Sequence, residues 1–368
     1  MRVKLFVLIL LVICCIISCS KKTTEVVTNT VAAPTFSIEP GAYMTAQTVT
    51  LVCTTEESTI RYTLNGATPD TSSYIYTAPI LIDSTKVITA RAYRTGWTPS
   101  PVVTASYTIP VPPPEMILVE GGVFNMGNEL NNDYENELPV HQVTLSSYYI
   151  GTHEINQSEW IAVMGSNPAA TPNINKPVEK VSWYSILAYC NKLSIQEGLT
   201  PVYSINGLTN PTSWGNIPTS NNLVWNAAVC NWSADGYRLP TEAEWEFAAK
   251  GGTPTQSFIY SGGDDLSLVG WYSGNSGAVT QRGSLKQANT LGLFDMSGNV
   301  WEFCWDLYGT YASWNQTNPT GAFSGITRIV RGGSWYSSEE YCRVSARGYQ
   351  YPHLKDNGIG FRVCRRVP

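Results

Sequence analysis

This 368-residue chain has nine cysteines and three histidines, side chains that can serve as nucleophiles or metal ligands. The histidines, His141, His153 and His353, are scattered and form neither the H-x3-H nor the HExxH spacing of a zinc site. The sequence therefore gives little support to a zinc or iron centre. It also contains no G-x-S-x-G nucleophile motif and no phosphate-binding P-loop, so hydrolase and nucleotide-dependent chemistry lack their usual motifs.

The N-terminal residues predict a lipoprotein leader. A positively charged start precedes an apolar run over residues 5–17, which is typical of a secretory signal peptide and shorter than the ~20 apolar residues of a spanning helix. The following Ser18-Cys19 completes a resemblance to a bacterial lipobox, in which the cysteine thiol accepts diacylglycerol. We expect residues 1–18 to be the signal peptide, Cys19 to be lipidated and residues 19–32 to be a polar tether. An ordinary signal peptide with an incidental Cys19 is the alternative.

Composition agrees with an exported protein. Only 14% of the residues are charged, against about 25% in an average soluble domain, while the chain holds 12 Trp and 21 Tyr. The formal net charge is −5 and no Lys/Arg block could follow a phosphate backbone, so nucleic acid is excluded as the expected partner. We expect a protein of the cell envelope, periplasmic or at the cell surface, held at the membrane by its N-terminal lipid.

Residues 33–109 predict a small β-sandwich. Short β-branched runs recur along this segment with turn residues between them, and Asn65-Gly66 is suited to a tight hairpin turn. Residues 62–70 with residues 76–80 resemble the chitobiase/β-hexosaminidase C-terminal-type domain. The resemblance implies an immunoglobulin-like accessory module that serves as a spacer or contacts a glycan.

Residues 110–114 predict a stiff linker, because consecutive prolines favour polyproline II and end strand pairing. Residues 115–368 predict one α+β domain. Strands are expected over residues 116–127 and 143–150, and helices over 156–164, 183–193 and 240–250, with Asn156, Ser182 and Pro240 or Thr241 at their starts.

Four stretches of this domain resemble, in order, the formylglycine-generating enzyme (sulfatase-modifying factor) family. They are residues 177–183, residues 236–246 with Gly-Tyr-Arg-Leu-Pro-Thr-Glu-Ala-Glu-Trp-Glu, residues 292–302, and Arg331-Gly-Gly-Ser-Trp335 with Gly360-Phe-Arg362. The resemblance implies a variant of the C-type lectin fold, which by itself does not settle function.

The family's activity would be oxidation of a sulfatase cysteine to formylglycine with Cu(I) held between two thiolates, spaced Cys-x4-Cys. Counting forward from Gly333-Ser334 places these positions at Ser337 and Cys342, whereas counting back from Arg347 places the nearer one at Glu339. Neither count yields two thiols. Cys342 is therefore a weak catalytic candidate, and we do not expect copper.

The same cysteine is a candidate for a disulfide, which export permits. Cys304 is the preferred partner of Cys342, and the family resemblance also implies a link between Cys190 and Cys364, although Cys364 stands one residue later than the family pattern. Cys230 is the cysteine of this domain that we expect to remain without a partner. Sequence spacing alone does not decide such pairings.

One metal site is implied by the family resemblance. The pattern Asp295-x-x-Gly298-x-Val300-x-Glu302 resembles a family calcium site built from two side chains and two backbone carbonyls, in which calcium would stabilise loops. Alternatively, Asp295 and Glu302 cap turns or pair with Arg331 or Arg362. Glu242, Glu244 and Glu246 could suggest acid/base chemistry, but we expect them on a short amphipathic helix with Trp245 and Phe247 in the core.

Two functions follow. The first is an exported lipoprotein whose aromatic-rich, lectin-like loops bind a protein or glycan ligand without catalysis. The alternative is a formylglycine-generating oxidase or related modifying enzyme with a divergent active site. A glycan-binding assembly built on residues 33–109 is a third interpretation.

Overall fold

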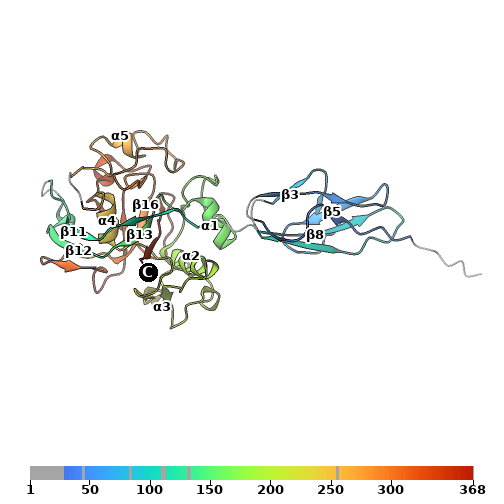
Figure 1. The fold of residues 1–368 in the computed structure, drawn as a ribbon, viewed down its shortest axis with the longest axis horizontal. Helices are drawn as coiled ribbons and strands as arrows, with labels where there is room; N and C mark the ends of the chain where they lie inside the picture. Colours follow the sequence, from blue (N-terminus) through green and yellow to red (C-terminus); the bar gives the residue numbers. More distant parts are fainter. Residues whose placement is uncertain are drawn as a thin grey trace, which may run out of the picture. The chain divides into compact units, whose positions relative to one another are not determined.

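The computed structural model describes residues 29–43, 46–82, 85–108, 113–130, 134–253 and 257–367 (Figure 1). The predicted signal peptide, Cys19, residues 19–28 of the tether and residues 110–112 of the linker lie outside this range. The chain divides into two compact units between Ile109 and Pro110. No helix within the described ranges combines the length and apolar character needed to cross a membrane.

The N-terminal unit is built from strands, as predicted. Its main sheet has the order β2 (Gly41–Ala42), β9 (Val103–Thr108), β8 (Lys86–Tyr93), β5 (Thr59–Thr63), β6 (Tyr74–Ile75). Two further pairs are β1 (Thr35–Phe36) with β4 (Leu51–Val52) and β3 (Gln47–Val49) with β7 (Ile80–Ile82). Alternating apolar residues from both layers, including Val49, Ile82 and Ile88, meet in one core.

The tight hairpin expected at Asn65-Gly66 is not present. β5 ends at Thr63 and its hairpin partner β6 begins only at Tyr74, so the two residues lie in a longer connection. The Gly66 amide donates to the Val87 carbonyl at 3.1 Å, which ties this connection to β8. The Asn-Gly pair correctly predicted a connection between strands, but it did not predict which strands that connection joins.

The C-terminal unit is an α+β domain of small sheets joined by long loops. One sheet is β10 (Met116–Val119), β13 (Tyr148–Gly151), β21 (Cys364–Arg366), and a second is β11 (Gly122–Met126), β12 (His141–Leu145), β17 (Gln316–Thr317). The third is β19 (Arg347–Gln350), β18 (Arg328–Arg331), β16 (Trp301–Leu307), β20 (Ile359–Gly360), and the fourth is β14 (Tyr203–Ser204) with β15 (Val229–Cys230).

The three predicted helices are confirmed, as α1 (Gln157–Met164), α2 (Trp183–Gln196) and α4 (Glu242–Ala249). Each begins with a capping box, in which Asn156, Ser182 or Thr241 accepts from the backbone amide three residues later. Two single-turn helices, α3 (Leu223–Asn226) and α5 (Leu266–Val269), and the 3-10 turns η1 (Glu135–Glu137), η2 (Pro211–Ser213) and η3 (Glu339–Cys342) complete the domain.

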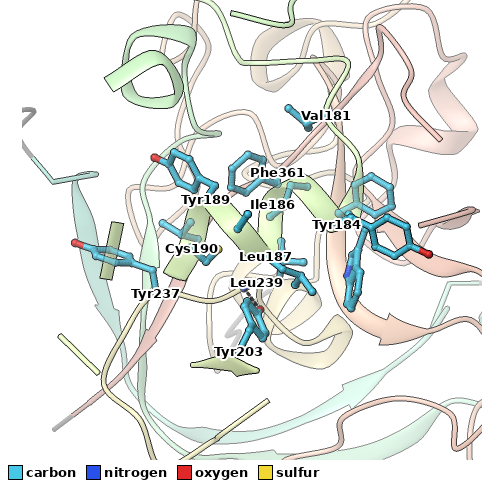
Figure 2. Packing of buried hydrophobic residues seen from close by; sticks show 14 of the residues in the cluster. Val181, Tyr184, Ile186, Leu187, Tyr189, Cys190, Tyr203, Tyr237, Leu239 and Phe361 are labelled. Atoms are coloured by element: carbon cyan, nitrogen blue, oxygen red, sulfur yellow. Dashed lines mark hydrogen bonds between the residues drawn. The ribbon is translucent and has the colours of Figure 1, made fainter. Parts of the chain in front are cut away.

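The largest core cluster of the C-terminal unit surrounds α2. Figure 2 shows Leu187 and Cys190 of this helix among Tyr203, Leu239 and Phe361. The α1 ring of Trp160 stacks on Tyr189 at a centroid distance of 5.3 Å, which joins the two helices. This core holds the ends of β16 and β18 in place, and the residues with candidate chemistry follow those strands.

Candidate functional site

The segment that carries the expected thiol positions follows β18 through a tight glycine turn. Gly333 has φ +78°, and a Cβ atom there would lie 2.6 Å from Cys342 Sγ. A side chain at position 333 would therefore both strain the backbone and displace the sulfur. The glycine allows Cys342, at the end of η3, to lie directly against the turn.

Cys342 lies in an apolar cluster with Tyr260, Leu266 and Val269. Its Sγ is 3.7 Å from the Ser338 carbonyl, to which the S–H group donates a weak hydrogen bond. Burial, followed by the charges of Glu339 and Glu340, raises the pKa of the Cys342 thiol to about 12. This environment keeps the sulfur protonated, whereas a copper ligand must be a thiolate.

Ser337, at the other expected thiol position, is a buried turn residue. Its Oγ accepts from the Ser334 amide at 3.0 Å, and its own amide donates to the Ser334 carbonyl at 2.9 Å. Glu339, the position reached by the other count, is exposed on η3. Hydroxyl and carboxylate oxygens are poor ligands for Cu(I), so the residues present at these positions do not fit a two-thiolate copper site.

The expected disulfides are not formed in the structure. Cys53, Cys190, Cys230, Cys304, Cys342 and Cys364 are all free thiols.

The cores explain why the expected partners do not meet. Cys304 belongs to the core cluster around β16 and α4, whereas Cys342 belongs to the separate small cluster described above. Cys190 lies in the α2 core and Cys364 in the cluster around α4. Cys230, predicted to remain alone, packs against the same core as Cys190, since it lies on β15 opposite Tyr203.

Asp295, the first residue of the expected calcium pattern, is buried with a positive φ of 56°. Its Oδ2 accepts from the Ser284 amide at 2.8 Å, while its Oδ1 is buried without a hydrogen-bond partner among the described residues. Burial raises the pKa of the Asp295 carboxyl to about 6. An unpaired buried carboxylate oxygen is a feature that a cation would satisfy.

Glu302, the last residue of the pattern, pairs instead with Arg362, one of the alternatives that the sequence left open. Arg362 donates to both carboxylate oxygens at 2.6 Å, and Trp245 Nε1 donates to Oε2 at 2.7 Å. Both oxygens of Glu302 are therefore engaged. This arrangement fits a minor role at a cation better than that of a principal ligand.

Gly298 and Val300 make different contacts through their backbones. Gly298 has φ +94°, and a Cβ there would lie 2.2 Å from the Trp271 carbonyl oxygen. The Val300 amide donates to Glu154 Oε1 at 3.1 Å. Asp295, Val300 and Glu302 therefore adjoin one buried acidic region around Glu154, whereas Gly298 packs against the Trp271 backbone.

Glu154 is a member of this region that the sequence pattern missed. Burial, with the neighbouring Asp295 and Glu302, raises its pKa well above the ordinary value. Its other oxygen accepts from Asn299 Nδ2 at 2.7 Å. Glu154 precedes α1, and no spacing signal links it to residue 295. Across the described residues, no three His, Cys, Asp or Glu side chains are arranged to hold a metal, so a cation here would need backbone oxygens as well.

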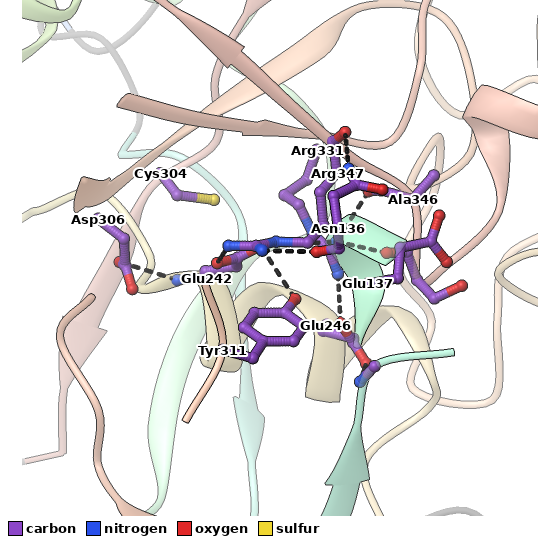
Figure 3. A network of polar contacts seen from close by, with 12 residues as sticks. Asn136, Glu137, Glu242, Glu246, Cys304, Asp306, Tyr311, Arg331, Ala346 and Arg347 are labelled. Atoms are coloured by element: carbon purple, nitrogen blue, oxygen red, sulfur yellow. Dashed lines mark hydrogen bonds and ion pairs between the residues drawn. The ribbon is translucent and has the colours of Figure 1, made fainter. Parts of the chain in front are cut away.

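The three glutamates of α4 overturn the expectation of an amphipathic helix, because all eight residues of α4 are buried. Each carboxylate meets an arginine. Glu242 pairs with Arg347 and Glu246 with Arg331, both far away in sequence, whereas Glu244 pairs with Arg238, six residues before it. Figure 3 shows the pairs of Glu242 and Glu246. These pairs join α4 to β18 and β19, and they support the domain rather than a reaction.

A set of aromatic side chains, which we call the aromatic face, lies beside the turn that holds Cys342. It consists of Trp301, Trp335, Tyr336 and Tyr341. The rings of Trp301 and Tyr341 are 6.4 Å apart and those of Trp335 and Tyr336 are 4.9 Å apart. Gly358 links the two pairs, since its carbonyl accepts from the Trp301 amide and its Cα packs against the Tyr336 ring.

Comparisons with known proteins match both units. Residues 104–367 match the sulfatase-modifying factor enzyme 1-like domain, and residues 38–104 match the chitobiase/β-hexosaminidase C-terminal domain. The chaperone protein LppX of Paenibacillus barcinonensis is 38% identical over 264 residues, covering 67% of this chain and 86% of LppX. The formylglycine-generating enzyme of Bos taurus is 28% identical over 294 residues, covering 69% of this chain and 75% of the enzyme. Treponema denticola variable protein 1 superposes with a TM-score of 0.64 at 36% identity, covering 75% of this chain and 98% of that structure.

Proposed function

The chain belongs to the sulfatase-modifying factor enzyme 1-like family, and from that premise we propose that it is an exported lipoprotein that binds a ligand without oxidising it. One observation carries the proposal: neither count of the expected thiol positions yields two thiols, and the one cysteine reached, Cys342, is buried and protonated. A copper-dependent oxidase needs two reduced, ionisable sulfurs at one metal. The family fold is kept while this requirement is not met.

The aromatic face is the proposed binding surface. Tyr336 and Tyr341 are 43% and 51% exposed, although large aromatic side chains are usually more deeply buried. Both lie beside the half-buried Trp301 and Trp335. Tyrosine and tryptophan dominate recognition surfaces because a rigid ring supplies a large contact at little entropic cost. The ligand class is protein or glycan. That LppX is named a chaperone protein agrees with a role in contacting other proteins.

The binding proposal is tested by probing the full chain with a random-peptide library and with a glycan array. We expect specific hits whose affinity falls about tenfold or more in Tyr341→Ala, since central aromatic residues carry much of an interface's binding energy. Tyr349→Ala is the matched control, because Tyr349 is an exposed ring on β19 that belongs neither to the aromatic face nor to any other proposed binding site. Hits that survive Tyr341→Ala and Tyr336→Ala would contradict the proposed surface.

We also propose that the acidic region binds one calcium ion as a structural element. The support is the unpaired Oδ1 of Asp295, described above, and the flanking backbone of Gly298 and Val300, with Glu154 and Glu302 adding negative charge. Asp295 would be the principal side-chain ligand, and the ion would supply only charge neutralisation and loop ordering.

Calcium binding is tested by thermal unfolding in calcium and in EDTA. A ligand that binds only the folded state raises Tm by mass action. We expect a higher Tm in calcium for the wild type and no calcium effect in Asp295→Asn, with magnesium as the comparison ion. Equal Tm values for the wild type in calcium and EDTA would refute the site.

The envelope location rests on residues 1–32, with Cys19 as the lipid attachment point. More than one acyl chain on a single residue gives firm anchoring, unlike a single chain. The chitobiase-type unit would then serve as a spacer between the tether and the C-terminal domain. The alternative of a divergent oxidase needs Cys342 to act without a thiolate partner.

A further inference from the structure

A second surface feature, separate from the aromatic face, is a cavity of about 370 Å³ beside the N-terminal end of α4. Its walls come from the end of β16 with Asp306, from β12 with His141, and from the loop after β16 that carries Trp314 and Phe323. The volume lies within the range of small-molecule sites, which begin near 300 Å³. The cavity is thus large enough for a small organic ligand.

The charged groups on its floor are already paired. Arg347 donates to the two oxygens of Glu242 at 2.6 and 2.8 Å, and its remaining Nη1 donates to the carbonyls of Asn136 and Gly309 (Figure 3). Four of the five guanidinium N–H groups therefore have acceptors, and the carboxylate of Glu242 balances the charge of Arg347. The pair presents a nearly neutral floor.

Asp306 adds polarity without adding charge. It is only 3% exposed, and its Oδ2 accepts from the Glu242 amide at 2.9 Å. Burial and the neighbouring Glu242 raise the pKa of Asp306 well above its ordinary value. A carboxyl group that keeps its proton can donate a hydrogen bond to a hydroxyl oxygen, and it does not attract a cation.

His141 provides an unpaired polar atom at the cavity. The residue is 6% exposed, and its Nδ1 lies 3.1 Å from the Pro139 carbonyl. Its Nε2 is buried and has no hydrogen-bond partner within the described ranges. Buried polar atoms are nearly always satisfied in native proteins, so this nitrogen would gain a hydrogen-bond partner if a ligand hydroxyl reached it.

The rim supplies exposed rings. Trp314 is 66% exposed and Phe323 is 106% exposed, and both line the cavity. Exposed aromatic side chains at the edge of a polar pocket offer flat apolar faces to a ligand. Tyr311 also lines the cavity, where its hydroxyl donates to Glu242 Oε1 at 3.1 Å and can still accept a hydrogen bond. We infer that this cavity binds an uncharged saccharide, with the apolar face of a sugar ring on Trp314 or Phe323 and its hydroxyls directed to His141, Asp306 and Tyr311.

The test is titration of the full chain in detergent with cellobiose, maltose and N,N′-diacetylchitobiose, followed by calorimetry. At least one of these neutral disaccharides should bind, and digalacturonate should bind more weakly because the floor offers no free cation. Trp314→Ala should lower the affinity about tenfold, and Phe323→Ala should also weaken it. Both residues are exposed, so these variants should fold normally. Tyr341→Ala, in the aromatic face, should leave saccharide binding unchanged.

Two results would overturn the inference. The first is the absence of heat with every neutral disaccharide. The second is binding that persists in Trp314→Ala and Phe323→Ala, or that is lost in Tyr341→Ala and so belongs to the aromatic face. Failure of this site would leave the proposed role of the aromatic face untouched, because the two sites share no residue.

Discussion

At the scale of single residues, Cys342, which one count places at an expected thiol position of the family, is part of a packed apolar cluster. Cys342 fills a space between the Gly333 turn and α5, and its neighbours Tyr260, Leu266 and Val269 exclude water. The same surroundings that raise its pKa also hold η3 in place. Cys342, the weak catalytic candidate of the sequence, therefore has a structural role in this chain.

Buried ion pairs are the other residue-level support. We expect Glu302→Gln to lower the free energy of unfolding by about 3–5 kcal/mol, because it leaves Arg362 buried without its charge partner. The measurement is urea unfolding followed by tryptophan fluorescence. Every tryptophan except Trp97 belongs to the C-terminal domain, so the signal reports mainly on that domain. Glu129→Gln is the matched control, since the side chain of Glu129 is 35% exposed and its contact with Lys250 is 3.4 Å. Equal losses in the two variants would contradict this account.

Asp306 predicts a pH dependence with a definite sign. Its folded-state pKa lies above the unfolded value, so the folded protein holds a proton that the unfolded chain has released. The stability that Asp306 contributes is therefore fully present below the unfolded pKa and is lost as the pH rises through the raised pKa. Relative to Asp306→Asn, the wild type should lose stability as the pH rises above the ordinary range of an aspartate carboxyl, measured by urea unfolding. A difference that stays constant with pH would refute the protonated state.

Some residue roles could be predicted from motifs in the sequence, whereas others become visible only in the fold. Arg362 as a partner of Glu302 was among the alternatives, because both belong to recognisable motifs. The partners of Glu242 and Glu246 were not foreseen, since Arg347 and Arg331 are far away in sequence. The pairing of Glu244 with Arg238 was missed although the two residues are six positions apart in one motif. Glu154 and His141 were missed as site residues for the same reason: only the fold brings them to the acidic region and to the cavity.

At the scale of elements, the helices were predicted well because their start signals are written in adjacent residues. Asn156, Ser182 and Thr241 each cap a helix as expected. The strands were harder, because pairing depends on contacts far apart in sequence. β17 pairs with β12 across more than half of the domain, and no sequence pattern indicates this.

The α1 cap gives an element-level prediction. Asn156→Ala should lower the free energy of unfolding by about 1 kcal/mol, because it removes the acceptor for the Glu159 amide. Asn156→Ser should retain most of the stability, since serine also caps helices. The measurement is the free energy of unfolding of the two variants and the wild type in urea. Equal losses of stability for the alanine and serine variants would show that the helix cap is not the cause.

At the scale of the whole molecule, a spacer-like β unit precedes a family domain, and the N-terminal residues supply the proposed anchor. Cys19→Ser should abolish labelling of the protein by radioactive palmitate and release it from the membrane fraction. Cys15→Ser, within the leader, should leave labelling intact and serves as the control. Label retained in Cys19→Ser would remove the lipid anchor from the account.

The central claim is that this domain keeps the family fold without its copper chemistry. The most direct measurement is mass spectrometry of a cysteine-containing sulfatase peptide after incubation with the copper-loaded chain in oxygen. We predict no conversion of the peptide cysteine to the formylglycine aldehyde. Oxygen-dependent aldehyde formation by the wild type that disappears in Cys342→Ser would contradict the claim.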